Sequence, residues 1–153
     1  MANPGSYVNG GKGGKVKLVS LNIGGNSSMF GGMDRYLGGQ EKADIIVLQE
    51  VKVQEQILLD LCKARGYLTK VSLDLASGLG VAVVWREEIP LIEYQIIREG
   101  RIQFLDLGFG PIVNVYGPAG KLSQRDRREF FGETLFARLS SLSQENSQFQ
   151  VLF

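Results

Sequence analysis

Short apolar runs separated by glycine-rich turns are the feature that most limits how this chain folds. Their length and their content of Val, Ile, Leu, Phe and Tyr are typical of β-strands. None approaches the roughly 18 apolar residues that a membrane-spanning helix needs, so we expect no membrane association. The runs cover residues 15–23, 43–49, 67–75, 80–85, 89–97, 101–107, 111–116 and 148–153.

Three other segments have the three- and four-residue apolar spacing of amphipathic helices. They are residues 29–37, 54–65 and 123–142. The second is the clearest, because Gly66 stands where a left-handed C-cap belongs. Strands and helices first alternate, and a run of strands follows. This order predicts an α/β domain of mixed sheets with helices packed outside.

The two ends of the chain carry separate expectations. Residues 1–14 are rich in glycine and nearly free of apolar side chains, so we expect a flexible leader. The stretch NGGKGGK at 9–15 does not match a phosphate-binding loop, because Val16 follows the lysine and a strand follows the segment. The last residues, QVLF at 150–153, form an uncapped apolar strand. Strand ends need partners, so we expect the front part of a longer protein; the alternative is an edge strand that ends the protein.

Composition excludes several kinds of chemistry. The chain of 153 residues has no histidine, so it holds no Ser–His or Cys–His triad and no histidine-ligated zinc. A single cysteine, Cys62, allows neither an internal disulfide nor an all-cysteine zinc site, and it favours a reducing, intracellular location. The net charge of +1 means that any affinity for nucleic acid must come from a local surface.

Polar side chains stand where three of the predicted strands end. Asn22 ends the first strand, Glu50 the second, and Tyr116 the strand before the long helix. Ligands gather where strand ends meet, and the amide and carboxylate oxygens of Asn22 and Glu50 suit Mg²⁺ or Mn²⁺. The alternative is that Asn22 begins a turn and that Glu50 is a solvated strand end.

Four motifs, in this order, resemble the endonuclease/exonuclease/phosphatase superfamily. They are LNIGG at 21–25, ADIIVLQEVK at 43–52, GLGVAVVW at 78–85 and NVYGPAG at 114–120. Within the superfamily they most resemble the apurinic-type endonuclease domain of LINE-type retrotransposons, and the resemblance runs over residues 15–153. It implies a two-layer β-sandwich flanked by helices, DNase-I-like, present here as its N-terminal part. It also implies a Mg²⁺- or Mn²⁺-dependent phosphodiesterase that nicks DNA.

The resemblance also implies roles for single residues. Glu50 would bind the metal, Asn22 would hold the metal or the phosphate, and Tyr116 would contact the phosphate through its hydroxyl. Lys52 matches a lysine of the apurinic endonucleases, a position that often varies in the retrotransposon type. Ala119 stands where many relatives have asparagine.

Two later motifs of the family, a GDFN-like loop and an SDH-like terminus, do not occur in the sequence. The chain alone should therefore be inactive. Its partners would be DNA, the second half of the domain and a reverse transcriptase region of the same polyprotein, in the nucleus. The alternatives are a non-catalytic interaction fragment, and a phosphoesterase of the superfamily that acts on RNA or phosphoinositide.

Basic side chains surround the start of the third predicted helix. Cations at a helix N-terminus oppose the helix dipole, so these residues suggest a compensating anion such as DNA phosphate. The alternative is a solvated charged face. The candidate nucleic-acid-binding residues are Lys52, Arg101, Lys121, Arg125 and Arg128, with Arg127 beside them.

Overall fold

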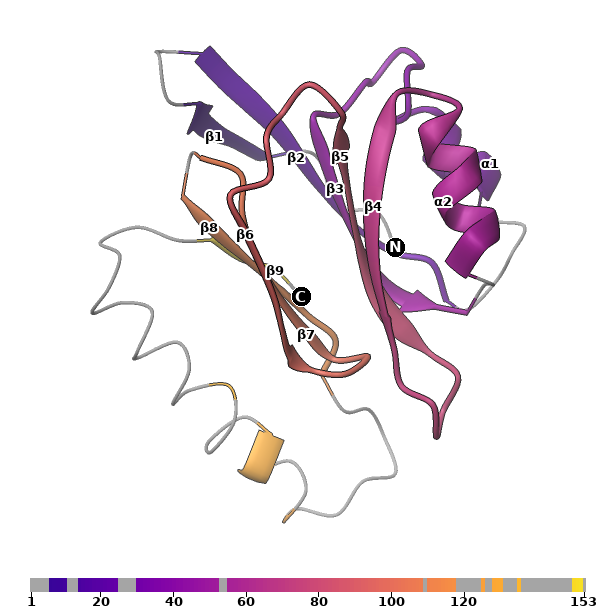
Figure 1. The fold of residues 1–153 in the computed structure, drawn as a ribbon, viewed down its shortest axis with the longest axis vertical. Coiled ribbons are helices and arrows are strands. Elements are labelled where there is room, and N and C mark those ends of the chain that lie inside the picture. Colours follow the sequence, from indigo (N-terminus) through magenta and orange to yellow (C-terminus); the bar gives the residue numbers. More distant parts are fainter. Residues whose placement is uncertain are drawn as a thin grey trace.

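Two β-sheets face each other in the computed structural model, with helices outside the first sheet (Figure 1). The structure describes residues 6–10, 14–24, 30–52, 55–108, 110–117, 125, 128–130, 135 and 150–152. Sheet A has the order β1-β2-β3-β5-β4 and sheet B the order β6-β7-β8-β9. This architecture confirms the predicted α/β sandwich.

The element bounds are close to those predicted from the sequence. Sheet A contains β1 (Ser6–Gly10), β2 (Gly14–Asn22), β3 (Ile45–Val51), β4 (Tyr67–Leu73) and β5 (Gly80–Arg86). Sheet B contains β6 (Glu93–Arg98), β7 (Ile102–Asp106), β8 (Pro111–Val115) and β9 (Gln150–Leu152). The helices are α1 (Phe30–Asp34) and α2 (Glu55–Lys63).

The structure differs from the sequence-based expectation in three places. Part of the predicted leader forms β1, which pairs antiparallel with β2, because the glycines at 10 and 14 bring the two strands together. β6 begins at Glu93, since residues 89–92 form the connection from β5. Ile57 is exposed, although it belongs to the apolar residues whose three- and four-residue spacing predicted the helix at 54–65. Most of the predicted helix 123–142 lies outside the described residues.

The strands β2 and β3 form the parallel centre of sheet A and are buried on both faces. Successive side chains of a strand point to opposite faces of the sheet, so each strand contributes to both layers. One set faces α1 and α2, and the other set faces sheet B. The helix-side cluster includes Val19, Leu21, Ile46, Leu48, Leu58, Cys62, Tyr67, Ala82 and Val84.

The space between the sheets changes character along its length. At one end it is apolar, filled by residues such as Leu18, Ile45, Trp85 and Leu105. At the other end buried Ser, Gln and Asn side chains take over. We call this polar end the β3 end, because β2, β3 and β8 all finish there. The turns that join β4 to β5 and β6 to β7 lie at the same end.

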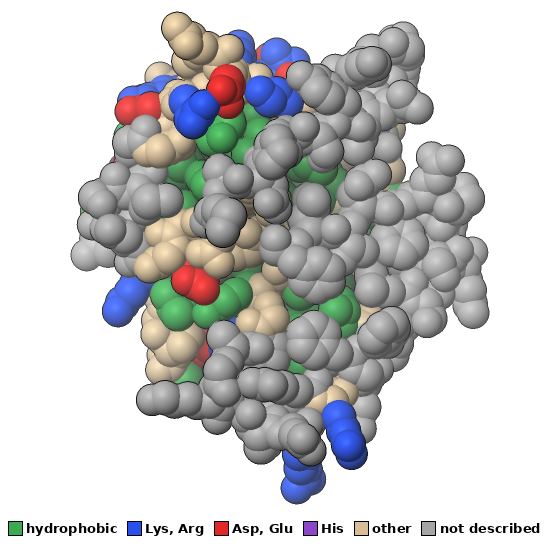
Figure 2. Space-filling model, turned by 180° about the vertical axis from the view of Figure 1, so that it is seen from behind, with side chains coloured by type: hydrophobic (Ala, Val, Ile, Leu, Met, Phe, Trp, Pro, Cys, Tyr) green, Lys and Arg blue, Asp and Glu red, His purple; other side chains and the backbone are tan. Residues whose placement is uncertain are grey.

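Charged side chains gather at the end opposite the β3 end, as Figure 2 shows at the top of the molecule. Arg86 pairs with Asp44 at 2.9 Å, Arg35 pairs with Glu41, and Arg65 pairs with Asp34. These arginines are paired and therefore add little to any basic surface. Within the described residues, no helix is long and apolar enough to cross a bilayer.

Tyr67 ties β4 to the segment before β3, and its removal should weaken the fold. Its hydroxyl donates to the carbonyl of Ala43 at 2.6 Å, and burial raises its pKa to about 12. The folded state therefore favours the protonated hydroxyl of Tyr67. This contribution to stability is fully present below pH 10 and is lost as the pH rises from 10 to 12. We expect Tyr67→Phe to cost about 1–2 kcal/mol at pH 8. Urea unfolding at pH 8 and at pH 11 measures this; the difference from wild type should shrink at pH 11.

Candidate metal and phosphate site

Asn22 and Glu50 finish neighbouring parallel strands at the β3 end. Asn22 is the register partner of Gln49, and the amide of Ile23 donates to the Gln49 carbonyl at 3.1 Å. The two strands therefore stay paired up to the residue before Glu50. The side chain of Asn22 turns back, and its Oδ1 accepts the amide of Gly24 at 2.9 Å, as expected for a turn-starting asparagine.

Glu50 sits in a β-bulge with a left-handed backbone. The ladder between β3 and β5 shifts register between Gln49 and Val51, and Glu50 has a φ of 54°. It is the one non-glycine residue with positive φ among the described residues. Such a conformation costs about 1–3 kcal/mol, and bulges of this kind redirect side chains next to functional sites. No pattern in the sequence predicted this bulge.

The Glu50 carboxylate is available for a ligand. It is half-buried, and it makes no hydrogen bond or ion pair within the part of the chain that the structure describes. A glutamate that merely capped a strand would gain nothing from a strained backbone. The bulge therefore favours the interpretation of Glu50 as a functional residue over that of a solvated strand end.

A buried polar network joins the two sheets directly below this site. The Gln49 side-chain amide donates to Asn114 Oδ1 at 2.9 Å, and Asn114 Nδ2 donates to the carbonyls of Leu48 and Ala82 at 3.1 Å. Asn114 belongs to β8, and it is fully buried. The Gln49–Asn114 hydrogen bond therefore connects the strand that carries Glu50 to the strand that leads to Tyr116. Sequence reasoning missed this network, although Asn114 lies within the NVYGPAG motif.

Tyr116 is brought to the same end of the sandwich. Its backbone amide donates to the carbonyl of Arg101 at 2.7 Å, and the Arg101 guanidinium lies 4.6 Å from the centre of the Tyr116 ring. Arg101 also donates to the carbonyl of Gly117 at 3.3 Å. A cation stacked on the face of the ring helps to fix the orientation of the ring. Both side chains are half-buried.

The other predicted nucleic-acid-binding residues do not all lie near Glu50. Lys52 is exposed two residues after Glu50 and therefore lies near the β3 end. Arg125 and Arg128 are exposed, and Phe130 beside them packs on the outer face of sheet B, where Arg98 stacks on its ring at 5.3 Å. Lys121 and Arg127 lie outside the described residues.

The donor atoms at the β3 end fit a hard divalent cation only in part. The Glu50 carboxylate and the Asn22 amide oxygen are the kind of ligands that Mg²⁺ accepts, and Mg²⁺ commonly binds one or two carboxylates and keeps several waters. Among the described residues, no group of three or more Asp, Glu, Cys or His side chains could hold a metal. Glu50 and Asn22 would therefore supply part of a coordination shell.

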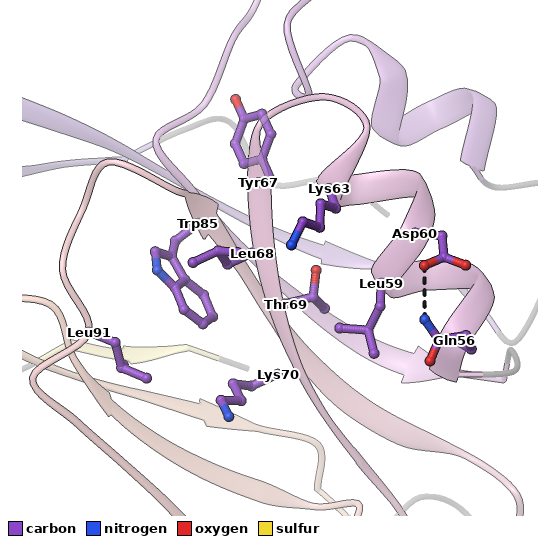
Figure 3. A pocket seen from close by; sticks show the side chains of 10 residues that line it. All are labelled: Gln56, Leu59, Asp60, Lys63, Tyr67, Leu68, Thr69, Lys70, Trp85 and Leu91. Carbon is purple, nitrogen blue, oxygen red and sulfur yellow. Dashed lines mark hydrogen bonds between the residues drawn. The ribbon is translucent and has the colours of Figure 1, made fainter.

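A groove of about 390 Å³ lies elsewhere, between α2 and the β4 edge of sheet A (Figure 3). Leu59 and Lys63 of α2 flank it on one side, and Trp85 and Leu91 on the other. Asn22, Glu50 and Tyr116 are not among the residues that line it. The groove is therefore separate from the candidate site.

The two mixed sheets form a DNase-I-like fold, and the solved structures that resemble the chain share it. No protein-family model and no curated protein sequence matches the chain significantly. The 3′ phosphatase NExo from Neisseria, bound to a product DNA hairpin, aligns with a TM-score of 0.66 and 18% identity. The alignment covers 85% of this chain and 52% of NExo.

Two further solved structures show the same fold. TDP2 from Caenorhabditis elegans aligns with a TM-score of 0.66 and 19% identity, over 92% of this chain and 46% of TDP2. An AP endonuclease from Archaeoglobus fulgidus aligns with a TM-score of 0.58 and 19% identity, over 86% of this chain and 52% of that protein. The chain thus spans about half the length of the structures that it resembles.

Proposed function

We propose that this chain supplies the N-terminal half of a divalent-metal-dependent DNA endonuclease site. The observation that carries the proposal is the Glu50 carboxylate on a left-handed bulge, which has no hydrogen-bond or ion-pair partner among the residues that the structure describes. It lies at the end of the sandwich that also holds Asn22 and Tyr116. The likeness to NExo with its DNA hairpin and to an AP endonuclease supports DNA as the substrate.

Each of the three residues would have a separate task at the scissile phosphate. Glu50, with Asn22, would hold Mg²⁺ or Mn²⁺, which when bound neutralises charge on the phosphate. Tyr116 would donate its hydroxyl proton to a phosphate oxygen, with Arg101 keeping the ring in place. Water would attack the phosphodiester and leave a 3′-hydroxyl. The groups that activate water and protonate the leaving oxygen would come from outside this chain, which has no histidine.

The resemblance to LINE-type motifs supports a more specific proposal about the biological role of the endonuclease. The endonuclease would act in the nucleus, within a polyprotein that also carries a reverse transcriptase, and would nick target DNA to prime reverse transcription. The test is a protein that carries this chain followed by the rest of the domain. It should nick supercoiled DNA in the presence of Mg²⁺ and leave ends that a polymerase extends. Release of terminal phosphate without nicking would instead favour a phosphatase.

The 153-residue chain by itself should not nick DNA. Its partial ligand set and its lack of histidine leave the attacking water and the leaving group without partners. Supercoiled plasmid incubated with the purified chain and Mg²⁺ should stay supercoiled, and the same is expected with the Glu50→Gln variant. Nicking by the wild-type chain that the Glu50→Gln variant lacks would contradict this expectation and place a whole active site within the chain.

A further inference from the structure

Gln103 is a polar side chain that is completely buried between the two sheets. It lies on β7 of sheet B, directly opposite Asn114 of β8 in the strand register. Burying a side-chain amide costs free energy unless both its oxygen and its nitrogen find partners, so hydrophobic packing alone does not explain a glutamine at this position. The roles of Glu50, Asn22 and Tyr116 at the candidate site do not involve Gln103 directly.

Both ends of the Gln103 amide have hydrogen-bond partners. Its Nε2 donates to the backbone carbonyl of Lys70 on β4 at 3.1 Å and to the hydroxyl of Tyr94 on β6 at 2.9 Å. Its Oε1 accepts from Nδ2 of Asn114 at 3.1 Å. Gln103 therefore connects β4, the last strand of sheet A, to the strand of sheet B that leads to Tyr116.

These bonds give three buried amides, those of Gln103, Asn114 and Gln49, a single orientation. A carbonyl oxygen can only accept, so the Lys70 carbonyl fixes which end of the Gln103 amide carries the nitrogen. The Gln103 oxygen then faces Asn114 Nδ2, and Asn114 Oδ1 in turn accepts from Gln49 at 2.9 Å. This amide chain runs from β4 across sheet B to the residue before Glu50, and each amide sets the orientation of the next.

The candidate site needs the two sheets held in one relative position. Glu50 and Asn22 both belong to sheet A, whereas Tyr116 directly follows β8 of sheet B. Apolar packing between the sheets is non-directional, but hydrogen bonds require a narrow range of distance and angle. A misplacement of about 1 Å at a reacting centre lowers a rate by about a hundredfold. The amide chain is therefore suited to fix the position of Glu50 relative to Tyr116.

We propose that Gln103 is a positioning residue, which aligns Tyr116 of the sheet B side with Glu50 of sheet A through Asn114 and Gln49. This inference rests on the proposed function and adds a residue that touches neither the metal nor the DNA. Both proposed metal ligands lie on sheet A. Loss of Gln103 should therefore leave the Mg²⁺ requirement unchanged and slow the step that needs groups from both sheets.

The test compares wild type with Gln103→Met in the protein that carries this chain followed by the rest of the domain. Methionine is similar in length and has no hydrogen-bond donor, and Asn114 Nδ2 keeps the carbonyls of Leu48 and Ala82 as acceptors. Nicking of supercoiled plasmid at saturating Mg²⁺ should slow by about ten- to a hundredfold. The Mg²⁺ concentration that gives half of the maximal rate should match that of wild type.

A double-mutant cycle with Tyr116→Phe separates positioning from a general loss of stability. In the Gln103→Met background the Tyr116 hydroxyl is no longer aligned with the phosphate. Tyr116→Phe should therefore lower the rate much less there than in the wild-type background. Fully additive losses would show that the two residues act independently and would overturn the proposal. A Gln103→Met protein that nicks at the wild-type rate, or that needs more Mg²⁺, would also overturn it.

Gln95→Met is the matched control. Gln95 lies on the neighbouring strand β6, but it is exposed and donates to Glu93 of the same strand at 2.8 Å. Its replacement should leave both the rate and the Mg²⁺ requirement unchanged. Gln103→Leu is a second replacement that is read in the same way as Gln103→Met. Loss of the fold in both would assign Gln103 to stability alone and overturn the proposal. Absence of nicking by wild type would overturn it together with the proposed function.

Discussion

Glu50→Gln should lower the rate of DNA nicking by two orders of magnitude or more in a protein that carries the complete domain. The substitution keeps the size of the side chain and removes the charge that a hard divalent cation needs. A loss of about 3 kcal/mol of transition-state stabilisation or more is typical when a principal electrostatic contributor is removed. The rate of conversion of supercoiled to nicked plasmid measures the effect, at several Mg²⁺ concentrations.

Two comparisons make the Glu50 result specific. Tyr116→Phe should cost less, about 1–3 kcal/mol, because it removes one hydrogen bond to a charged oxygen. DNA affinity at low salt should barely change in either variant, since phosphate contacts elsewhere dominate affinity. Normal nicking by Glu50→Gln together with a collapse of binding would show that Glu50 is a docking residue and that the metal assignment is wrong.

Asn114→Ala should lower the free energy of unfolding by about 3 kcal/mol. Asn114 donates to two backbone carbonyls of sheet A and accepts from Gln49, all out of contact with water. Removing the amide leaves several buried polar groups unpaired, and each costs about 1–3 kcal/mol, although some regain partners on relaxation. Chemical denaturation followed by circular dichroism measures the change in the isolated chain.

Gln56→Ala is the control for this stability effect. Gln56 also donates a side-chain hydrogen bond, to Asp60 at 2.8 Å, but it is exposed on α2. Water replaces its partner, so the unfolding free energy should change by less than about 0.5 kcal/mol. Equal effects of the two substitutions would mean that the network below Glu50 does not hold the sheets together.

The sequence by itself predicted the sheets and the strand-end residues, because these depend on local patterns. Alternation and apolar runs located β2, β3, β5, β7 and β8 within a few residues. Gly66 takes the predicted left-handed cap, with a φ of 82°. The polar residues Asn22, Glu50 and Tyr116 were recognisable because each ends a clear run. The prediction of a flexible leader was wrong for residues 6–10, which form β1. A short strand flanked by glycines is stable only when it pairs with a neighbouring strand, here β2.

Only the tertiary structure decided how these ends become a site. The left-handed bulge at Glu50, the Gln49–Asn114 bond between sheets and the Arg101–Tyr116 stack join residues 15 to 65 positions apart. Gln49 and Asn114 look like ordinary polar residues in the sequence, because hydrophobic periodicity records burial but not which buried polar groups meet. Their pairing depends on the packing of one sheet on the other, and this packing places Glu50 and Tyr116 at one end of the sandwich.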